Sequence, residues 1–553
     1  MRVAIISVFV DYHRRGAHHR GVLQPQVGPL IAALLPDSAE IDIVNDTWVD
    51  PDWSRAYDLV FLSCMHAEFD RARQIAHWYR RRGAQVVIGG SMASLYPQLC
   101  LPWFDAVVVG DPEDTVPHVY EDARRHQLQR LYRSGGDAAA RAPTPLAERV
   151  AHQQIFPLAL EVTRGCPYTC DFCVLTGMGT RFDTRPIARV EGDLVRLAAA
   201  LKGRVAGPLK RRRRRLAMFY DNNIAGHLGY LRQLCDLTER LGLEWASSVT
   251  FNVLTNRALL QRMFDSGCRA LYVGLETFNP AALDDFHKPQ NRLSQVRRAL
   301  DDAREAGILV TAGMILSPQH DAAAYIRSLP RRLRESGLHV PTFLAFETPF
   351  PGTPYFSRLA RRDAEGRAGG AFLPNALLRD FTSYTLVVRP SLATAEDYVC
   401  AYRDTVDEIY APLRRLGKLA RDVPALVKAG GWTSALLDVG DMLTAGLPRA
   451  PGRTYLAGTD LAPPEQVPLT DADFASEAEA DAVRRPVAVT DARGRLLPQW
   501  APLDDSLRAV APPRRTQPAA VSGSAKHKPC HPRTRSTSRP STRSRRRSAA
   551  PIR

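Results

Sequence analysis

Short apolar runs alternate with amphipathic stretches through residues 1–130. Gly, Asp and Pro bound the apolar runs, as they bound buried strands, and the stretches between repeat apolar residues at helical spacing. The expected strands are Val3–Val10, Ile41–Val44, Leu59–Ser63, Gln85–Ile88 and Ala106–Val109. The expected helices are Val27–Leu35, Arg71–Arg82 and Thr115–Asp122. This alternation predicts a parallel sheet with helices on both faces, a doubly wound α/β domain.

The same alternation, with longer helices, continues through residues 150–360. The expected strands are Leu158–Val162, Leu216–Tyr220, Glu244–Val249, Ala270–Val273, Val310–Ile315 and Thr342–Glu347. The expected helices are Ile187–Leu201, Gly229–Leu241, Arg257–Ser266, Leu293–Ala306 and Ala322–Ser336. About six β/α units are too few for a closed eightfold barrel, so we expect a partial (β/α)6 TIM-type barrel.

The pattern changes again after the expected barrel. Residues 361–450 are expected to be mostly helical, because Glu396–Tyr410 repeats apolar residues at helical spacing and Pro412 then marks a stop or a kink. Residues 451–512 are rich in Pro, Ala and Asp and read as an irregular extension. Residues 513–553 form a tail of Arg, Ser and Pro that we expect to be disordered.

The net charge of +16 belongs mostly to that tail. Residues 513–553 contain 12 Lys or Arg and no Asp or Glu, so the remaining residues carry +4. We interpret the tail as a solvated extension and do not expect a nucleic-acid partner. Contact with nucleic acid or anionic lipid is the less favoured alternative. A second basic run, Lys210–Arg215, is expected to be an exposed loop face. The globular part therefore has an ordinary charge balance.

The start of the chain and its cysteine content indicate a cytoplasmic protein. Met1–Val10 is apolar but lacks a small-residue cleavage site and reads as a first strand. No apolar run approaches the roughly 18 residues of a membrane span. Nine cysteines in 553 residues are too sparse for a disulfide framework, so spaced cysteines are expected to bind metal or take part in chemistry.

The strongest candidate for chemistry is the CxxxCxxC spacing of Cys166, Cys170 and Cys173. Three thiolates on one loop can hold three irons of a [4Fe–4S] cluster, which leaves the fourth iron without a protein ligand. A small molecule can then coordinate that open iron. A structural zinc site is the alternative. Such a site requires four ligands, and no further CxxC or HxxxH motif lies nearby to supply the missing ligand.

The cysteine loop resembles that of the radical S-adenosylmethionine (SAM) superfamily. The resemblance includes the aromatic Phe172 before the last cysteine and the sequence Gly165-Cys166-Pro167. It implies that the open iron chelates the amino and carboxylate groups of SAM. Both the [4Fe–4S] cluster and SAM are therefore expected cofactors.

The resemblance also implies SAM contacts at the carboxyl ends of later strands, where barrels of this type gather their chemistry. The implied SAM-binding residues are Asp221, Asn222, Asn223, Gly274, Glu276, Pro351 and Gly352. Where relatives continue with Gly after Gly313–Leu316, this chain has Ser317-Pro318, which puts that contact in doubt. Structural alternatives stay open: Asp221 as a helix cap, Glu276 as the partner of a surface Arg, and the Pro-rich segment as a simple turn.

The N-terminal domain resembles the Rossmann-like cobalamin-binding domain that precedes many radical SAM modules. Doubly wound sheets bind ligands beyond the carboxyl ends of their strands, where this chain places Ser63, Met65, Gly89 and Gly90. Residues 110–114 match the acidic turn usual near the end of such domains. The sequence Asp-Tyr-His-Arg-Arg-Gly at 11–16 matches Asp-x-His-x-x-Gly, which makes His13 a candidate lower ligand of cobalt. A water, or no ligand, is the alternative.

Together these features resemble the class of cobalamin-dependent radical SAM methyltransferases that includes hopanoid methylases. The resemblance implies cleavage of SAM and methylation of an unactivated carbon of a small-molecule or lipid substrate, with a flavodoxin or ferredoxin as electron donor. Cobalamin-assisted rearrangement or cyclisation, and a non-catalytic cobalamin or cluster sensor, are the alternatives. A tRNA methylthiotransferase would need a second cysteine set, and only Cys64 and Cys100 stand in the N-terminal domain. The residues predict neither the substrate nor a catalytic side chain.

Overall fold

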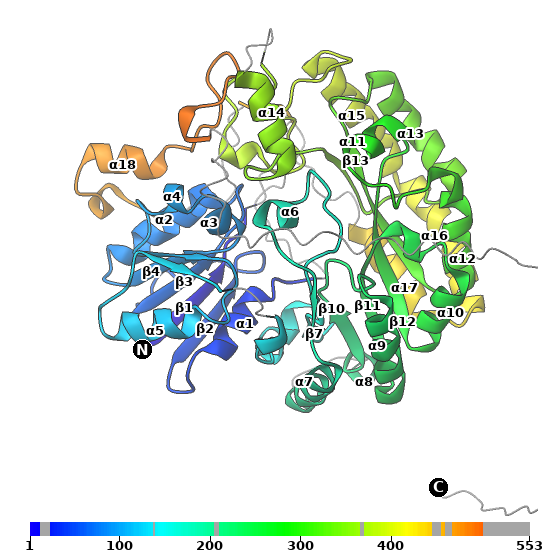
Figure 1. Ribbon diagram of the computed structural model, residues 1–553, viewed down its shortest axis with the longest axis horizontal. Helices are drawn as coiled ribbons and strands as arrows, with labels where there is room; N and C mark the ends of the chain where they lie inside the picture. The colour runs from blue at the N-terminus through cyan, green and yellow to red at the C-terminus, as the bar shows by residue number, and fades with distance from the viewer. Residues whose placement is uncertain are drawn as a thin grey trace, which may run out of the picture. The chain divides into compact units, whose positions relative to one another are not determined.

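Two parallel six-stranded sheets form the frame of the computed structural model (Figure 1). The structure describes residues 1–10, 23–135, 139–203, 210–364, 370–444, 455–458 and 467–500. The predicted cobalt ligand His13 and the basic tail 513–553 lie outside these ranges. An α/β protein built on parallel sheets is therefore confirmed.

The N-terminal sheet has the strand order β2-β1-β3-β4-β5-β6. Its strands are β1 (Arg2–Ser7), β2 (Glu40–Asn45), β3 (Leu59–Ser63), β4 (Gln85–Gly89), β5 (Ala106–Val109) and β6 (Leu131–Arg133). Helices α1 (Val27–Leu34) and α5 (Val116–Arg124) pack on one face. The other face carries α2 (Phe69–Arg80), α3 (Ser91–Leu95) and α4 (Pro97–Cys100). The strand order reverses between β1 and β3, which is the position where doubly wound sheets bind ligands.

The second sheet follows the chain in order, β7-β10-β11-β12-β13-β14, as a partial barrel requires. Its strands are β7 (Leu158–Leu160), β10 (Leu216–Phe219), β11 (Glu244–Val249), β12 (Cys268–Glu276), β13 (Leu309–Leu316) and β14 (Phe343–Phe346). The connecting helices are α7 (Ile187–Ala200), α9 (Leu228–Leu241), α10 (Arg257–Asp265), α12 (Val296–Glu305) and α13 (Ala323–Ser336). These helices bury their apolar sides against one face of the sheet, which leaves the inner face for other contacts (Figure 1).

Two local predictions were wrong. The first strand ends at Ser7 and not at Val10, because the Phe9 N–H donates to the Asp46 carboxylate at 3.1 Å instead of continuing the ladder. The basic run predicted as a loop begins as a short helix, α8 (Lys210–Arg213), whose Arg212 pairs with Glu244 at 3.1 Å. Within the region predicted as mostly helical, residues 370–394 contain no α-helix.

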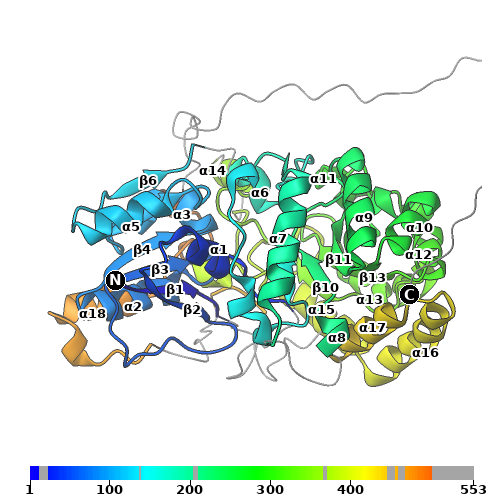
Figure 2. The same ribbon diagram turned by 90° about the horizontal axis from the view of Figure 1, so that it is seen from below.

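Four helices do lie in that C-terminal region: α14 (Pro354–Ala364), α15 (Ala395–Ile409), α16 (Pro412–Lys428) and α17 (Trp432–Thr444). Pro412 is the first residue of α16, where its missing N–H costs no hydrogen bond, so the predicted break between helices is confirmed. Figure 2 shows α16 and α17 lying side by side, and the two helices contact each other.

Residues 467–500 pack into the core of the N-terminal sheet. Helix α18 (Glu477–Arg484) lies on α2, and Val467, Val489 and Trp500 are buried in the same apolar cluster as Phe69 of α2. A bridge between Leu377 and Ala488 ties this segment to the residues before α15. No sequence motif predicted this packing. None of the described helices has the length and apolar character that crossing a membrane requires.

Trp500 is the side chain through which this late segment should contribute most to stability. It is fully buried, its ring centroid lies 5.1 Å from that of Tyr96, and its indole N–H donates to the Ala488 carbonyl at 2.8 Å. We expect Trp500→Ala to lower the free energy of unfolding by about 3–5 kcal/mol, because it leaves a cavity in the core. Urea unfolding followed by circular dichroism measures this loss. Trp432, which is 60% exposed on α17, is the control, and Trp432→Ala should cost less than about 1 kcal/mol. Equal losses for the two variants would contradict the packing.

Candidate functional site

The cysteine loop follows the first barrel strand, as the sequence predicts. It runs from β8 (Thr163–Arg164) to α6 (Val174–Met178), and β8 pairs with β9 (Asp183–Thr184) in an antiparallel ribbon. Gly165 has a φ of 76°, and a Cβ at this position would lie 2.2 Å from the Arg181 carbonyl oxygen. Only glycine therefore permits the turn into Cys166.

The thiols of Cys166, Cys170 and Cys173 lie close enough to influence one another's ionisation. Burial raises the pKa of Cys170 to about 11; the Lys288 ammonium opposes this rise, and the neighbouring thiols add to it. Burial also raises the pKa of Cys173, while the backbone N–H groups of Leu175 and Thr176 lower it. Binding of iron by these thiols requires that their protons leave, and the nearby donors and cation favour that loss.

Donors to the sulfur atoms are the kind of contact that tunes an iron–sulfur cluster. The Asn223 side-chain amide donates to the Cys166 sulfur at 3.8 Å. Across the part of the chain that the structure describes, no three His, Cys, Asp or Glu side chains converge closely enough to surround one metal ion. A structural zinc ion is bound by four converging ligands, whereas in a [4Fe–4S] cluster each thiolate binds a different iron.

The three polar residues predicted after β10 have different environments. Asp221 is 3% exposed and accepts hydrogen bonds from the N–H groups of Val162 and Thr163, so that it holds the start of the cysteine loop. Burial raises the pKa of Asp221 to about 8. It does not cap α9, because His227 does. Asn222 is exposed and Asn223 is buried against Cys166.

Strand β12 ends in a strained bulge that brings Glu276 back over Gly274. Glu276 has a φ of 68°, rare for a residue with a side chain, and the strand register shifts between the two residues. A Cβ on Gly274 would lie 2.2 Å from a Glu276 carboxylate oxygen. The Asn291 amide donates to the carbonyls of Gly274 and Leu275 at 3.0 and 2.8 Å and so fixes the bulge.

Glu276 forms a buried ion pair with Lys288, and not with a surface Arg. Both side chains are 7% exposed. The Lys288 ammonium also lies 5.9 Å from the centre of the Phe172 ring, within the cysteine loop. Sequence analysis missed Lys288, because it lies in a segment without a motif and only the fold brings it to the cysteines.

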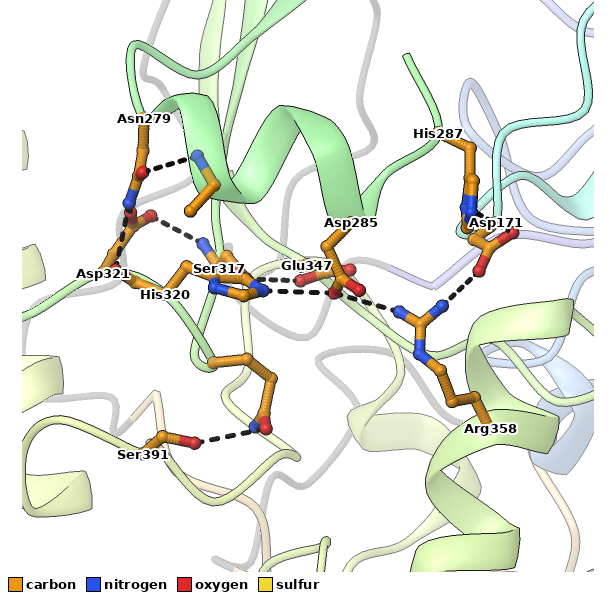
Figure 3. Close-up of polar contacts among 12 residues, drawn as sticks. Asp171, Asn279, Asp285, His287, Ser317, His320, Asp321, Glu347, Arg358 and Ser391 are labelled. Carbon is orange, nitrogen blue, oxygen red and sulfur yellow. Dashed lines mark hydrogen bonds and ion pairs between the residues drawn. The ribbon is translucent and has the colours of Figure 1, made fainter. Parts of the chain in front are cut away.

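An ionic chain ties the cysteine loop to α14 (Figure 3). Asp171 pairs with Arg358 of α14, and with His287 at 3.1 Å. The Arg358 guanidinium also pairs with the Asp285 carboxylate at 3.0 Å, and the His320 imidazole lies 3.3 Å from the same carboxylate. The Tyr355 N–H donates to the Asp171 carbonyl at 3.0 Å. Asp171, between two candidate ligands, is thereby held at both its backbone and its side chain.

Ser317, where relatives were expected to have Gly, has a structural role in Figure 3. Its hydroxyl donates to Glu347 at 2.8 Å, and its N–H donates to Asp321 at 2.7 Å. Glu347 is 2% exposed, and burial raises its pKa to about 8. Burial likewise raises the pKa of Asp321 to about 6. Two buried carboxyl groups therefore stand at the carboxyl ends of β13 and β14.

Pro351 and Gly352, the predicted adenine-facing residues, are buried between other segments. Gly352 has a φ of 90°, and a Cβ there would contact Leu95 of α3 at 2.9 Å. On the other side, a Cβ at Gly177 of α6 would lie 2.6 Å from the Gly352 carbonyl oxygen. This turn thus packs the N-terminal sheet's α3 against the end of the cysteine loop, and its contact with SAM stays a prediction.

Arg164, two residues before Cys166, binds the acidic turn that follows β5. Its guanidinium lies 2.7 Å from Glu113, 3.3 Å from Asp111 and 2.6 Å from Glu161. The side chain is 11% exposed. The cysteine loop and the carboxyl-end loops of the N-terminal sheet are thus joined by one ionic network.

The predicted cobalamin residues lie at the carboxyl edge of the N-terminal sheet. Ser63 ends β3 beside the point where the strand order reverses, and Met65 is 47% exposed there. Gly89 ends β4, and Gly90 has a φ of 92° with a Cβ position 2.7 Å from the Cys64 carbonyl oxygen. The buried hydroxyls of Ser7 and Ser91 have no hydrogen-bond partner among the described residues. An edge with glycines, an exposed apolar side chain and unsatisfied hydroxyls fits a large polar-rimmed cofactor.

Comparison with known families decides the nature of the barrel. Residues 160–325 match the model of the Radical SAM superfamily. The chain contains a radical SAM domain. The predicted radical SAM domain is thereby confirmed, and with it a radical SAM enzyme that uses a [4Fe–4S] cluster and SAM as cofactors. The residues that bind these cofactors stay predictions, and so does a cytoplasmic location.

The radical SAM chain is similar to curated methyltransferases. Bacteriochlorophyllide d C-8(2)-methyltransferase of Chlorobaculum tepidum is 24% identical over 341 residues, which cover 59% of this chain and 74% of that protein. Hopanoid C-2 methylase of Rhodopseudomonas palustris is 26% identical over 361 residues, which cover 62% of this chain and 65% of that protein.

Two solved structures share the fold. TsrM from Kitasatospora setae, a radical SAM methyltransferase solved with cobalamin and a [4Fe–4S] cluster, matches with a TM-score of 0.52 at 16% identity, over 74% of this chain and 88% of that one. The cobalamin-dependent radical enzyme OxsB, solved with aqua-cobalamin and SAM, matches with a TM-score of 0.56 at 12% identity, over 79% and 72%. The shared fold extends well beyond the radical SAM domain.

The Glu276–Lys288 pair gives a stability prediction. Removing one partner of a buried ion pair leaves an unpaired charge, so Lys288→Met should lower the free energy of unfolding by about 3 kcal/mol. The double variant Glu276→Met/Lys288→Met should be more stable than Lys288→Met alone, since it buries no unpaired charge. Urea unfolding of the iron-free protein measures both, with the exposed Lys202→Met as control. Strictly additive losses would argue against the coupling.

Glu347 gives a pH prediction. Its pKa rises from an unfolded value of about 4.3 to about 8 on folding, so the folded state binds the proton more tightly. The stabilisation is complete below about pH 4 and is lost as the pH rises towards 8. Relative to Glu347→Gln, the wild type should therefore lose stability on the order of a few kcal/mol between about pH 5 and pH 8. Unfolding at both pH values, with the exposed Glu335→Gln as control, measures this difference. Parallel pH profiles for wild type and Glu347→Gln would refute it.

Proposed function

We propose that this radical SAM protein is a cobalamin-dependent methyltransferase that methylates an unactivated carbon of a small-molecule or lipid substrate. The observation that carries the proposal is the Arg164 network. It joins the loop of the candidate cluster ligands to the acidic turn after β5, at the same carboxyl edge of the N-terminal sheet as the candidate cobalamin residues after β3 and β4. Two cofactor sites joined in this way suit a reaction that uses both cofactors on one substrate.

Cys166, Cys170 and Cys173 are the proposed ligands of the [4Fe–4S] cluster. When bound, the cluster supplies one electron through an iron that no side chain holds. Asn223 donates to the Cys166 sulfur, and the Lys288 ammonium provides positive charge beside Cys170 and Cys173. These groups favour the thiolate state, and Arg358 holds Asp171 so that the loop keeps its shape.

The proposed SAM site lies on the strand ends beside the cluster loop. Asn222 stands exposed there, and Gly274 leaves room for the inward-turned Glu276. Asp221 positions the loop, because its carboxyl group accepts hydrogen bonds from the N–H groups of Val162 and Thr163, and burial raises its pKa to about 8. Pro351 and Gly352 are the last residues of the proposed SAM site, and we expect their backbone to face the adenine.

The proposed cobalamin site is the carboxyl edge of the N-terminal sheet, with Ser63, Met65, Gly89 and Gly90. When bound, cobalamin supplies a carrier for the methyl group. The exposed Met65 offers an apolar surface, and the hydroxyls of Ser7 and Ser91 offer hydrogen bonds. Two solved neighbours of this fold bind cobalamin, and the curated relatives are named as methyltransferases, which supports this assignment.

The first experiment tests the cluster ligands. We expect Cys166→Ala/Cys170→Ala/Cys173→Ala to lose the iron that the wild type retains after anaerobic reconstitution, and to form no 5′-deoxyadenosine from SAM with dithionite as reductant. Iron analysis and chromatography of the SAM products measure both. Cys400→Ala, which changes an exposed cysteine, is the control and should retain both. Cleavage of SAM by the triple variant would defeat the assignment.

The same assay separates the alternatives when hydroxocobalamin is added. A methyltransferase should form S-adenosylhomocysteine only in the presence of cobalamin, because the methyl group must leave SAM before the substrate is modified. An enzyme that catalyses a rearrangement or cyclisation should form 5′-deoxyadenosine alone. A sensor should carry the cluster or the corrin absorption band through gel filtration and turn over no SAM.

A further inference from the structure

A cavity of about 520 Å³ occupies the inner face of the radical SAM barrel, apart from the cofactor residues described above. Strands β10 to β14 form its floor, through side chains such as Met218, Tyr272 and Phe343. Helices α15 and α17 close it, through Tyr402 and Leu437. Its size is in the range of sites for small organic ligands.

The lining is apolar and aromatic with few polar groups. Tyrosines and aliphatic side chains dominate, hydroxyls such as Ser248 and Thr311 add hydrogen-bonding groups, and Asp441 is its one carboxylate among the described lining residues. No Lys, Arg or His is among them. Burying an anion without a cation is costly, so the cavity discriminates against negatively charged ligands.

On β12, β13 and β14 the cavity is lined by residues from the first half of each strand, such as Ala270, Leu309 and Phe343, before the strand ends of the candidate SAM site. Tyr272 and Phe343 stack with ring centroids 6.0 Å apart, and both rings reach over Gly313. A Cβ at Gly313 would lie 2.4 Å from the Phe343 ring and 2.4 Å from the Tyr272 hydroxyl oxygen, so glycine leaves the room that these two side chains occupy. The next inward-turned residues towards the carboxyl end include Glu276, which influences the pKa of Tyr272. A molecule in the cavity therefore lies next to the candidate SAM site, behind one aromatic pair.

The apolar lining continues to the surface of α17. Leu436 lines the cavity and is nevertheless 54% exposed. Trp432, Val439 and Leu443 are exposed on the same helix at helical spacing, which forms one apolar face. Such a face gives an apolar molecule a path to the cavity wall.

We infer that this cavity binds the apolar framework of the substrate, which is therefore a neutral or non-anionic molecule with a hydrocarbon or aromatic body. The inference rests on the proposed function only in naming the occupant as the substrate. Binding of an apolar ligand follows from the lining alone.

Gly440 of α17 offers a direct way to fill the cavity. It lines the cavity, has an ordinary helical backbone, and a Cβ placed on it meets no atom within 4 Å. Gly417 of α16 is a matched control, because it is also helical with open space around its Cβ, but it is exposed and lies outside the cavity. Phenylalanine at either position adds the same side chain to a helix.

The experiment uses the full chain and two dyes that differ by one sulfonate. N-phenyl-1-naphthylamine is neutral and apolar, and 8-anilino-1-naphthalenesulfonate carries the added negative charge. Fluorescence titration should show the neutral dye saturating one site on the wild type and on Gly417→Phe. Gly440→Phe should bind it at least about tenfold more weakly, because the new ring occupies the site. The anionic dye should bind the wild type about tenfold more weakly than the neutral one.

Melting temperature and iron content after reconstitution show whether Gly440→Phe is folded. Should that variant unfold, Gly440→Leu replaces it, with Gly417→Leu as its control. Equal binding of the neutral dye to the Gly440 variant and the wild type would overturn the inference, and so would a preference for the anionic dye. A failure of the proposed function is distinguishable, since it would appear as absent SAM cleavage with dye binding intact.

Discussion

The ion pairs of Arg164 are the interaction on which the arrangement of this protein depends. A guanidinium that is 11% exposed must be neutralised where it lies, and Glu113, Asp111 and Glu161 do so. Burial raises the pKa of Glu161, while the neighbouring Arg164 opposes this rise. Glu113 and Asp111 come from the loop after β5. The cost of burying the Arg164 charge is therefore fully offset only when the cysteine loop packs against the N-terminal sheet. These ion pairs therefore fix the position of the cysteine loop, and they add little to the free energy of unfolding.

A second constraint acts at the end of β12, where backbone strain and a buried charge pair occur together. Glu276 takes a left-handed conformation that an ordinary side chain avoids, and it does so beside a glycine whose missing Cβ makes room for its carboxylate. Asn291 and Lys288 hold the bulge from opposite sides. Strain of this kind persists where the surroundings over-determine it, and such positions cluster at functional sites. Here the strained carboxylate and its lysine lie beside the candidate cluster ligands.

The barrel interior divides into two chemical environments. The carboxyl ends of its strands hold ionic and hydrogen-bonding groups, from Asp221 to the buried Glu347. The inner face of the sheet holds an apolar cavity, and the stacked rings of Tyr272 and Phe343 lie between this cavity and the strand ends of β12 and β13. Polar chemistry at one end and an apolar volume at the other match a reaction in which reactive cofactors meet an unreactive carbon framework.

The amino-acid sequence by itself determined the two parallel sheets, the partial barrel and the position of the cysteine loop after its first strand. These depend on local information, namely the alternation of apolar runs with helical periodicity and the spacing of three cysteines within one loop. The break at Pro412 was equally local, because proline removes a backbone donor. The superfamily could be inferred at this level since its motif is contiguous.

Only the tertiary structure decided which distant residues meet that loop. Lys288, Arg358 and the acidic turn of residues 110–114 reach it from other elements, and no periodicity or spacing in the chain encodes those contacts. The packing of Trp500 into the N-terminal core and the enclosure of the cavity by α17 likewise depend on long-range closure. Side chains far apart in the sequence pair because burial makes an unpaired charge or an empty volume costly, and that cost exists only in the folded chain.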